Sequence, residues 1–228
     1  MGPKYVTGAL PSQIPETLVT RLAKVELATV GHFRDRGFVH RSISAIKAPV
    51  GTLIGTAFTI AIPADDSTLL QHAISQLRPG DFLMIDRLGD ERHACLGGGV
   101  AFGVKRRGAV GAVIDGPCTD PHEIIEHDLP VWCRGVSSVT TRIRDNGGAL
   151  NKPISCGNVP VMPGDVVLAD GTGVLVIPLD EVEAVCEEAL MRQDRLTAMM
   201  QQFAEGSPMP KSRASTLVEA AINGDTNG

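Results

Sequence analysis

The sequence is poor in aromatic residues and in clustered positive charge. Aromatic residues make up 4% of its 228 residues, with one Trp and one Tyr, so the core must be built from aliphatic side chains. The net charge is −5, and the one group of adjacent cations, Lys105-Arg106-Arg107, falls at an expected helix end, where it complements the helix dipole. A nucleic-acid-binding surface needs clustered cations and stacking aromatics. We therefore predict no direct binding of nucleic acid.

Paired cysteines and long apolar runs are also missing. The five cysteines form no C-x-x-C pair, which is typical of free thiols in a reducing compartment and not of a disulfide framework. No run approaches the ~18 apolar residues of a membrane span, and residues 1–10 contain no apolar core of signal-peptide length. From these features we expect a cytoplasmic protein without a membrane partner.

The hydrophobic content of 43% is sufficient for one substantial core. No interdomain linker or solenoid repeat is visible, so we predict a single domain over residues 1–228, with a polar C-terminal tail at 206–228. Apolar periodicity predicts an amphipathic helix over Pro15–Arg36 and a long helix from Asp180 to about Ala204. Alternating side chains over Thr52–Ile62 predict a strand. Shorter helices are expected over Ser67–Leu77 and Ser215–Ile222.

One sequence motif occurs twice. Pro79-Gly80-Asp81 leads into an apolar stretch that ends at Asp86, and Pro163-Gly164-Asp165 leads into one that ends at Asp170. Each Pro-Gly turn is expected to begin a buried strand. A third apolar strand, Val110–Ile114, follows a glycine-rich helix over Gly97–Arg107. This order of elements predicts a parallel crossover and an α/β fold.

Candidate functional residues gather after these strands, because ligands of α/β folds bind beyond the carboxyl ends of strands. The three glycines Gly97, Gly98 and Gly99 open a helix, where free backbone amides can bind a carboxylate or phosphate, although a glycine-rich turn without a ligand has the same pattern. Asp120 closes the loop after the third strand and can hold a hard cation such as Mg²⁺. The competing interpretation is that Asp120 caps the helix that begins at Pro121, with Glu123 three residues further on.

Two other residue types in this region have simple structural explanations. The six histidines show no paired metal spacing, so they are interpreted as structural or surface residues, with His93, just before the glycines, as the best exception. Cys118 shares the loop of Asp120 and is interpreted as a buried, inert thiol, because no feature of the sequence indicates a lowered pKa.

The segment Gly111-Ala112-Val113-Ile114-Asp115-Gly116, followed by Asp120, resembles the core motif of a known superfamily. That superfamily holds the regulator of ribonuclease activity A (RraA) and the 4-hydroxy-4-methyl-2-oxoglutarate / 4-carboxy-4-hydroxy-2-oxoadipate aldolases. Further similarity lies in Gly55–Thr59, in both Pro-Gly-Asp turns and in Cys156-Gly157, and it extends over about residues 20–205. The resemblance implies a single-domain swivelling β/β/α-type fold with a mixed sheet, assembled as a homotrimer or homohexamer with sites between subunits.

The resemblance also implies site residues. In the aldolases an Asp, here Asp120, holds Mg²⁺ or Mn²⁺, and the backbone amides of the turn at Gly97–Gly99 bind the pyruvate carboxylate. An arginine that binds substrate and stabilises the enolate corresponds to Thr119, and a second acid corresponds to Gly98, so this chain departs from the family at both positions. One lost oxyanion donor can cost ~10²–10³ in rate. We therefore hypothesise that Arg87 replaces the arginine and that His93 shuttles a proton.

The functional prediction is a divalent-metal-dependent carbon–carbon lyase, of aldolase or decarboxylase type, acting on a small 2-oxo-carboxylic acid through a metal-stabilised enolate. Asp120 would hold the metal, Arg87 and His93 would join it in catalysis, and Gly97, Gly98, Gly99 and Thr119 would bind substrate. Two alternatives stay open. One is a hydratase, tautomerase or other lyase acting on a different small acid. The other is a non-catalytic, ring-shaped regulator that binds a ribonuclease or helicase, which the departures at Thr119 and Gly98 favour.

Overall fold

The computed structural model describes residues 2–208 and 210–222 and divides the chain into two compact units, Met1–Leu190 and Met191–Gly228. The single domain over residues 1–228 stays a prediction. Part of the predicted tail at 206–228, namely residue 209 and residues 223–228, lies outside the described residues. Within the described ranges, no helix combines the length and hydropathy that a membrane crossing requires.

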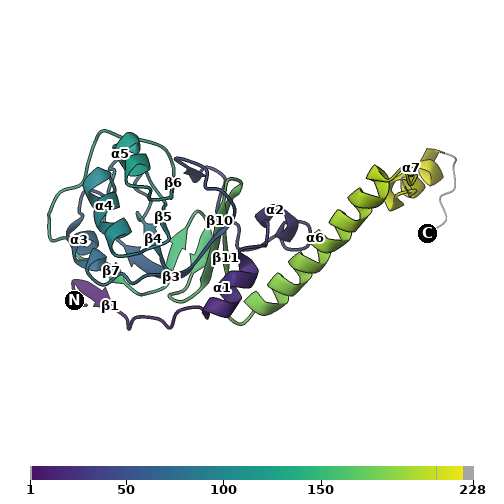
Figure 1. The fold of residues 1–228 in the computed structure, drawn as a ribbon. Helices are drawn as coiled ribbons and strands as arrows, with labels where there is room; N and C mark the ends of the chain where they lie inside the picture. Colours follow the sequence, from purple (N-terminus) through teal and green to yellow (C-terminus); the bar gives the residue numbers. More distant parts are fainter. Residues whose placement is uncertain (1, 209, 223–228) are drawn as a thin grey trace. The chain divides into compact units, whose positions relative to one another are not determined.

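The first unit is built on a mixed nine-stranded sheet (Figure 1). Its centre consists of four strands that pair in parallel in the order β3, β4, β5, β6. Their bounds are Leu53–Ala61, Asp81–Asp86, Gly111–Ile114 and Val131–Cys133. Three helices on one side of the sheet connect these four strands in turn (Figure 1), namely α3 (Thr68–Ile74), α4 (Gly98–Arg106) and α5 (Pro121–Glu126). The predicted parallel crossover is therefore confirmed.

Antiparallel strands extend this centre. Strand β3 also pairs with β7 (Gly148–Leu150) and with β10 (Val166–Asp170), and β10 continues into β11 (Gly173–Ile177). The edge strands β1 and β2 span Tyr5–Thr7 and Ser44–Ala45. A separate two-stranded sheet joins β8 and β9, Ile154–Cys156 and Val159–Val161. The predicted mixed sheet is thus present.

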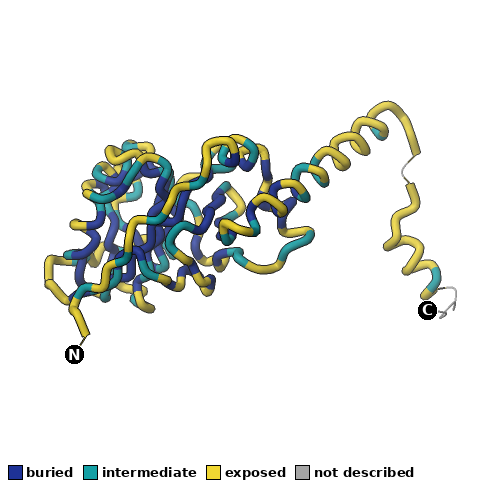
Figure 2. Tube along the Cα trace, turned by 90° about the horizontal axis from the view of Figure 1, so that it is seen from below, coloured by how far each residue is buried: buried dark blue, intermediate teal, exposed yellow. Residues whose placement is uncertain are grey.

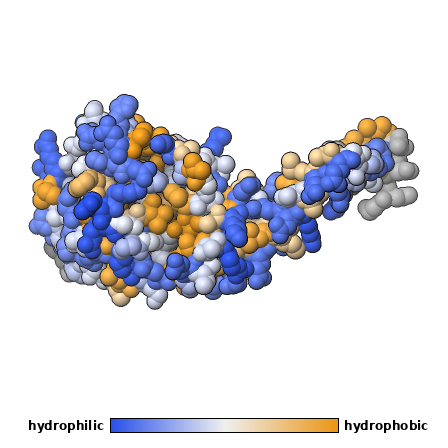
Figure 3. Space-filling view, viewed as in Figure 1, coloured by the Kyte–Doolittle hydropathy of each residue, from blue (hydrophilic) through white to orange (hydrophobic). Residues whose placement is uncertain are grey.

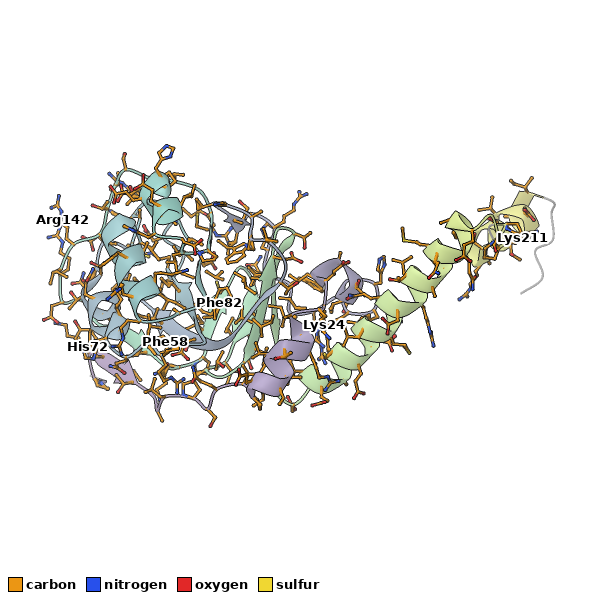
Figure 4. The ribbon with its side chains drawn as sticks, viewed as in Figure 1. Lys24, Phe58, His72, Phe82, Arg142 and Lys211 are labelled. Atoms are coloured by element: carbon orange, nitrogen blue, oxygen red, sulfur yellow. The ribbon has the colours of Figure 1, made fainter. Side chains whose placement is uncertain are left out.

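Aliphatic side chains fill both faces of the sheet, as the scarcity of aromatics requires. Strand β3 is buried along almost its whole length, so the alternation in its sequence does not mark a solvent-facing side. Phe58 lies in the cluster under α3, α4 and α5, whereas Phe82 lies on the other face with its ring 5.7 Å from that of Trp132 (Figure 4). Figure 2 shows the buried residues concentrated in the interior of this unit.

The N-terminal helix prediction is wrong in its extent. Pro15–Arg36 forms two short helices, α1 (Glu16–Leu22) and α2 (Leu27–Val30), that pack on the sheet. The chain turns between them because Glu26 is extended and because the Val25 carbonyl accepts a hydrogen bond from Thr52 Oγ1 at 2.7 Å. That bond satisfies a carbonyl that a continuous helix would have used internally.

The C-terminal helices agree with the sequence prediction. Helix α6 spans Val182–Ala204, and α7 spans Arg213–Ile222. The start of α6 is buried against the core of the first unit through Val182, Val185 and Ala189. In the second unit apolar side chains stand among polar ones on the surface (Figure 3), with Leu196 51% exposed and Met200 60% exposed. The prediction of an α/β fold with a mixed sheet and a long C-terminal helix is confirmed.

Candidate active site

A cavity of about 400 Å³ lies beyond the carboxyl ends of the parallel strands, between the N-terminus of α4 and the loop before α5. Four of the predicted residues line it: Gly97, Gly99, Thr119 and Asp120. They meet because β4 and β5 run in parallel and the segments that follow them leave the sheet at the same edge. Gly98 contacts the same place through its backbone, since its N–H donates to Asp120 Oδ2 at 3.2 Å.

Asp120 does not cap its own helix. Its backbone is left-handed, with φ 51° and ψ 52°, and its side chain makes no capping hydrogen bond to α5. The carboxylate turns instead toward α4, where it accepts hydrogen bonds from the Gly98 N–H and from Thr119 Oγ1, each at 3.2 Å. Asp is one of the residues that adopt this conformation most readily, and Asp120 is one of six non-glycine residues with positive φ in the described part of the chain. The cap interpretation of Asp120 is therefore wrong.

The glycine turn permits a close approach between these two loops. A Cβ atom on Gly97 would lie 2.5 Å from Asp120 Oδ2 and 2.6 Å from Thr119 Cγ2, so any side chain there would push the carboxylate away. Helix α4 begins at Gly98, and the first amides of a helix have no intrahelical acceptor. The turn thus presents amide donors beside an exposed carboxylate, an arrangement suited to a bound anion and cation together.

The remaining two predicted residues do not line the cavity. The Arg87 side chain is 0% exposed, and its Nη2 donates to the carbonyls of Ala64 and His93 and contacts Asp90 Oδ2 at 3.4 Å. Its Nε and Nη1 are buried and have no hydrogen-bond partner among the described residues. The His93 ring is held by Asp90, with Nδ1 3.0 Å from Oδ1. Direct contact of Arg87 or His93 with a substrate stays a prediction, since neither is among the residues that line the cavity.

The positive charge of Arg87 nevertheless affects a residue that lines the cavity. Cys95 lines the cavity, and burial raises the pKa of its thiol to about 11 against the opposing influence of the Arg87 cation. The Arg87 charge therefore acts electrostatically on a side chain of the cavity lining. A buried cation with two unpaired nitrogens is costly, so its presence there calls for a reason beyond packing.

Comparison with known proteins places the chain in a family. The profile of the RraA-like family (Aldolase/RraA) matches residues 24–176. The chain belongs to the RraA-like family. A protein of Halalkalibacterium halodurans, provisionally named a 4-hydroxy-4-methyl-2-oxoglutarate aldolase, is 34% identical over 141 residues, covering 62% of this chain and 67% of that protein. The 4-hydroxy-4-methyl-2-oxoglutarate aldolase of Thermus thermophilus is 29% identical over 115 residues, covering 50% and 69%.

The fold comparison agrees. The crystal structure of RraAS2 from Streptomyces coelicolor, described as an unusual member of the RNase ES inhibitor RraA protein family, superposes with a TM-score of 0.73 at 25% identity. The superposition covers 86% of this chain and 99% of that one. The family resemblance seen in the sequence is thereby confirmed, and the family contains both aldolase-named and regulator-named proteins.

The oxygen donors of the cavity in this RraA-like chain fit a hard divalent cation. Asp120 is exposed, and each of its carboxylate oxygens has only one hydrogen bond, at 3.2 Å. No group of three or more His, Cys, Asp or Glu side chains placed to hold a metal occurs in the described part of the chain. Mg²⁺ typically takes one or two protein carboxylates and keeps several waters, so Asp120 with few protein partners is compatible with it.

Four polar residues of the cavity were not anticipated from the sequence: Ser67, Gln71, Thr140 and Thr141. The two threonines lie on a segment that runs beside Ala94, where the Ala94 N–H donates to the Val139 carbonyl at 2.8 Å. Asp66, which is 1% exposed, holds this segment through hydrogen bonds from the backbone N–H groups of Arg144 at 3.0 Å and Asn146 at 2.7 Å. The only sequence pattern near these residues is Asp66-Ser67-Thr68, which indicates the start of a helix and gives no indication of the cavity.

Arg142 continues the same segment but leaves the cavity. Its side chain points outward from the edge of the first unit (Figure 4), while its backbone carbonyl accepts a hydrogen bond from the Ser67 N–H at 2.9 Å. The cavity is thus lined by neutral hydroxyl groups, one amide side chain and the Asp120 carboxylate, and no arginine or lysine is part of its lining.

Proposed function

We propose that this RraA-like protein is a divalent-metal-dependent lyase, of aldolase or decarboxylase type, that acts on a small 2-oxo-carboxylic acid. The observation that carries the proposal is the left-handed Asp120, whose carboxylate faces the Gly97–Gly99 turn inside one cavity. The names of aldolase relatives support the same class of reaction. Mg²⁺ or Mn²⁺, when bound, supplies Lewis-acid stabilisation of the negative charge that develops on the 2-oxo oxygen.

The other residues of the cavity would bind the cation and the substrate. Asp120 holds the cation, and the amides at the start of α4 bind the substrate carboxylate, which the helix dipole favours. The hydroxyl groups of Ser67, Thr140 and Thr141 orient the rest of a small polar substrate. Thr119 keeps the Asp120 carboxylate in place through its hydroxyl hydrogen bond at 3.2 Å.

Arg87 acts in this proposal as a positioning residue. Its buried cation ties the carbonyls of Ala64 and His93 together and favours negative charge at the cavity, where the lining has no cation. His93, fixed by Asp90, takes a proton only after a movement that brings its ring to the cavity. In this proposal Arg87 replaces the positive charge of the family's arginine but not its direct contact with the substrate.

The test is a screen of small 2-oxo acids with Mg²⁺ or Mn²⁺ that measures release of pyruvate. We expect activity that EDTA abolishes and that Asp120→Asn lowers by ~10²-fold or more, while Glu126→Gln, an exposed change on the same helix, leaves it unchanged. Borohydride with substrate should trap no adduct, which separates this chemistry from a Schiff base on Lys105. Activity that survives both EDTA and Asp120→Asn would contradict the proposal.

Two other functions have specific support. The departures at Thr119 and Gly98 and the similarity to RraAS2 favour a regulator that binds a ribonuclease. In that case the chain would inhibit a ribonuclease, and Asp120→Asn would leave that inhibition unchanged. A hydratase or tautomerase would show substrate loss by NMR without pyruvate release, and Asp120→Asn would abolish that loss. The three outcomes are mutually distinguishable in one set of proteins.

Assembly is the remaining part of the proposal. The family resemblance implies a homotrimer or homohexamer with sites between subunits, and a cavity lined by one chain without any cation leaves room for a neighbour's contribution. Light scattering should therefore give a mass of three or six chains at micromolar concentration. A stable monomer with full activity would contradict a site shared between subunits.

A further inference from the structure

Two carboxylates contact the same glycine at the start of α4. The Gly98 N–H donates to Asp120 Oδ2 at 3.2 Å. From the other direction, a Cβ atom placed on Gly98 would overlap with Glu123 Oε2 and would lie 2.7 Å from both Cβ and Cδ of Glu123. The Glu123 side chain therefore fills the space that any side chain at position 98 would occupy.

The backbone of Gly98 does not itself require glycine. Gly98 lies in helix α4 and is not among the glycines with positive φ in the described residues. The three atoms nearest to a Cβ atom on Gly98 are Oε2, Cβ and Cδ of Glu123, so the Glu123 side chain excludes a larger residue there. Glycine at 98 and glutamate at 123 thus form a complementary pair, in which one residue gives the space and the other supplies a charged group.

Glu123 reaches this position because of its place on α5. It lies in the first turn of α5, three residues after Asp120, and both residues are exposed. In a capping box Glu123 would bond the Asp120 N–H, but no such hydrogen bond occurs among the described residues, and the Asp120 side chain makes no cap either. The pair is turned toward α4 and not toward its own helix.

Two like charges that contact one residue repel each other unless a cation accompanies them. Neither Asp120 nor Glu123 makes an ion pair with another side chain of residues 2–208 or 210–222, and their charge is opposed by the dipole of α4 and by the hydrogen bonds that Gly98 and Thr119 donate to Asp120. We propose that Glu123 is the second carboxylate of the divalent-cation site, with Asp120 as the first. This assignment rests on the proposed function, because it assumes the cation that Asp120 would hold.

The proposal is tested by Mn²⁺ binding, measured by calorimetry on full-length wild type, Glu123→Gln, Asp120→Asn and Glu126→Gln. Loss of a supporting group typically costs 10–100-fold in metal affinity, so we expect Glu123→Gln to weaken Mn²⁺ binding ~10-fold or more. Glu126→Gln, an exposed acid of the same helix without a contact to Gly98, should change it less than about two-fold.

The outcomes separate this inference from the proposed function. If Asp120→Asn loses Mn²⁺ while Glu123→Gln binds it as the wild type does, Glu123 has no role and only this inference is overturned. If the wild type binds no Mn²⁺, the metal-dependent lyase proposal falls together with it. Thermal unfolding of each variant shows whether a change in affinity reflects a change in folding.

A charge exchange provides the second test. Glu123→Gly removes the three atoms that a Cβ on Gly98 would meet, the Glu123 Cβ included, and Gly98→Asp in that background places a new carboxylate in the freed space. Glu123→Gly alone should weaken Mn²⁺ binding ~10-fold, and the added Gly98→Asp should recover most of the loss, whereas Gly98→Asn should not. Equal recovery with Asp and Asn would mean that packing and not charge is responsible, and the proposal would be wrong.

Discussion

The two Pro-Gly-Asp strands are nearly identical in local structure and differ in what they lead to. Gly80 and Gly164 both adopt positive φ, 87° and 95°. In each turn the Asp carboxylate accepts a hydrogen bond at 2.8 Å from the N–H three residues earlier, Arg78 for Asp81 and Met162 for Asp165. The same short phrase therefore makes the same turn twice.

The far ends of the strands also match. Asp86 accepts a hydrogen bond from the Leu88 N–H, and Asp170 accepts one from the Thr172 N–H, both at 2.7 Å. Beyond that point the chains diverge. After Asp170 the chain returns at once as β11, whereas after Asp86 it makes a long excursion to α4 and then returns as the parallel strand β5.

This comparison shows where function can arise. Local chemistry fixes the turn and the ends of a strand, but the partners of the strand are fixed by the whole sheet. The hairpin after Asp170 returns the chain directly to the sheet, while the crossover after β4 opens the edge at which Gly97 and Asp120 meet. Equivalent substitutions in the two turns should therefore have unequal effects.

The largest expected difference concerns the first acid of each turn. Asp81 is 0% exposed, and besides the turn bond it accepts hydrogen bonds from Arg78 Nη2 at 3.0 Å and Gln13 Nε2 at 2.9 Å. Asp81→Asn removes a buried charge and leaves the guanidinium of Arg78 unpaired, so we expect a loss of about 3 kcal/mol in the free energy of unfolding. Urea denaturation at pH 7 measures it, and a loss below about 1 kcal/mol would mean that the extra contacts contribute little.

The next difference lies at the strand exits, where Arg87 follows Asp86 and Gly171 follows Asp170. If the buried cation supports the reaction, Arg87→Ala should lower kcat/KM for a 2-oxo acid by ~10²-fold or more. Arg87→Lys should retain part of the rate because it keeps the charge, and Thr119→Arg should restore part of the loss in Arg87→Ala. Arg106→Ala, an exposed cation at the end of α4, is the control.

An unchanged rate in Arg87→Ala would end the idea that the positive charge has moved to this position. A fall in rate for Arg87→Lys as large as for Arg87→Ala would show that the two carbonyl contacts, to Ala64 and His93, matter more than the charge. Resolving kcat and KM separately shows whether substrate binding or the reacting state is affected.

A smaller effect is expected at the segment that completes the cavity. Burial would raise the pKa of Asp66, but hydrogen bonds from Thr68, Arg144 and Asn146 outweigh it and lower the pKa to about 2. Because the pKa of Asp66 is lower in the folded state, its ionised carboxylate stabilises the protein at pH values above the ordinary pKa of 3.8. That stability is lost as the pH falls toward 2. Asp66→Asn should cost about 2 kcal/mol at pH 7 and progressively less below pH ~4.

Asp65→Asn is the matched control for this prediction. The Asp65 carboxylate is 42% exposed and pairs with Arg144 Nε at 3.2 Å on the surface, so its replacement should cost less than about 1 kcal/mol. If the two variants lose the same stability, or if the cost of Asp66→Asn does not depend on pH, the hydrogen bonds to Asp66 do not hold the cavity segment.

Much of the strand framework could be predicted because it depends on local patterns. The apolar runs with Pro-Gly starts gave β4 and β10, and the glycines and the Asp120 loop met because parallel strands end at one edge. The break between α1 and α2 could not be predicted, since it depends on the contact of Thr52 with the Val25 carbonyl. Such a contact joins residues distant in sequence and leaves no periodic signal.

The candidate site was predictable only in part, for the same reason. Thr140 and Thr141 lie in a segment without helices or extended strands, between Cys133 and Gly148, which Asp66 holds from elsewhere in the fold. Arg87 was expected to face the ligand because it follows a strand end. Position along the chain does not determine which way a side chain points, and the Arg87 guanidinium turns inward, to the carbonyls of Ala64 and His93.

The smallest expected effect is also the most discriminating for the comparison of the two turns. Asp165 corresponds to Asp81 and is only 7% exposed, but it lacks a cationic partner among its contacts and accepts one hydrogen bond, from the Met162 N–H. Burial raises the pKa of its carboxyl, with the negative charges of Asp180 and Glu181 adding to the effect and the Met162 N–H opposing it. A raised folded pKa means that the folded state binds the proton more tightly than the unfolded state, so ionisation of Asp165 opposes folding.

This penalty from ionised Asp165 is absent at pH values below the ordinary pKa of 3.8, grows as pH rises toward the folded pKa, and is constant above it. Asp165→Asn keeps an oxygen acceptor for Met162 and removes the charge, so it should leave stability near pH 3 unchanged and increase it at pH 7 by no more than about 1 kcal/mol. The same substitution would then destabilise one turn and stabilise its twin. Urea denaturation of both variants at the two pH values decides this, and a loss of stability in Asp165→Asn at pH 7 would show that the charge of Asp165 is needed in its turn as that of Asp81 is in the other.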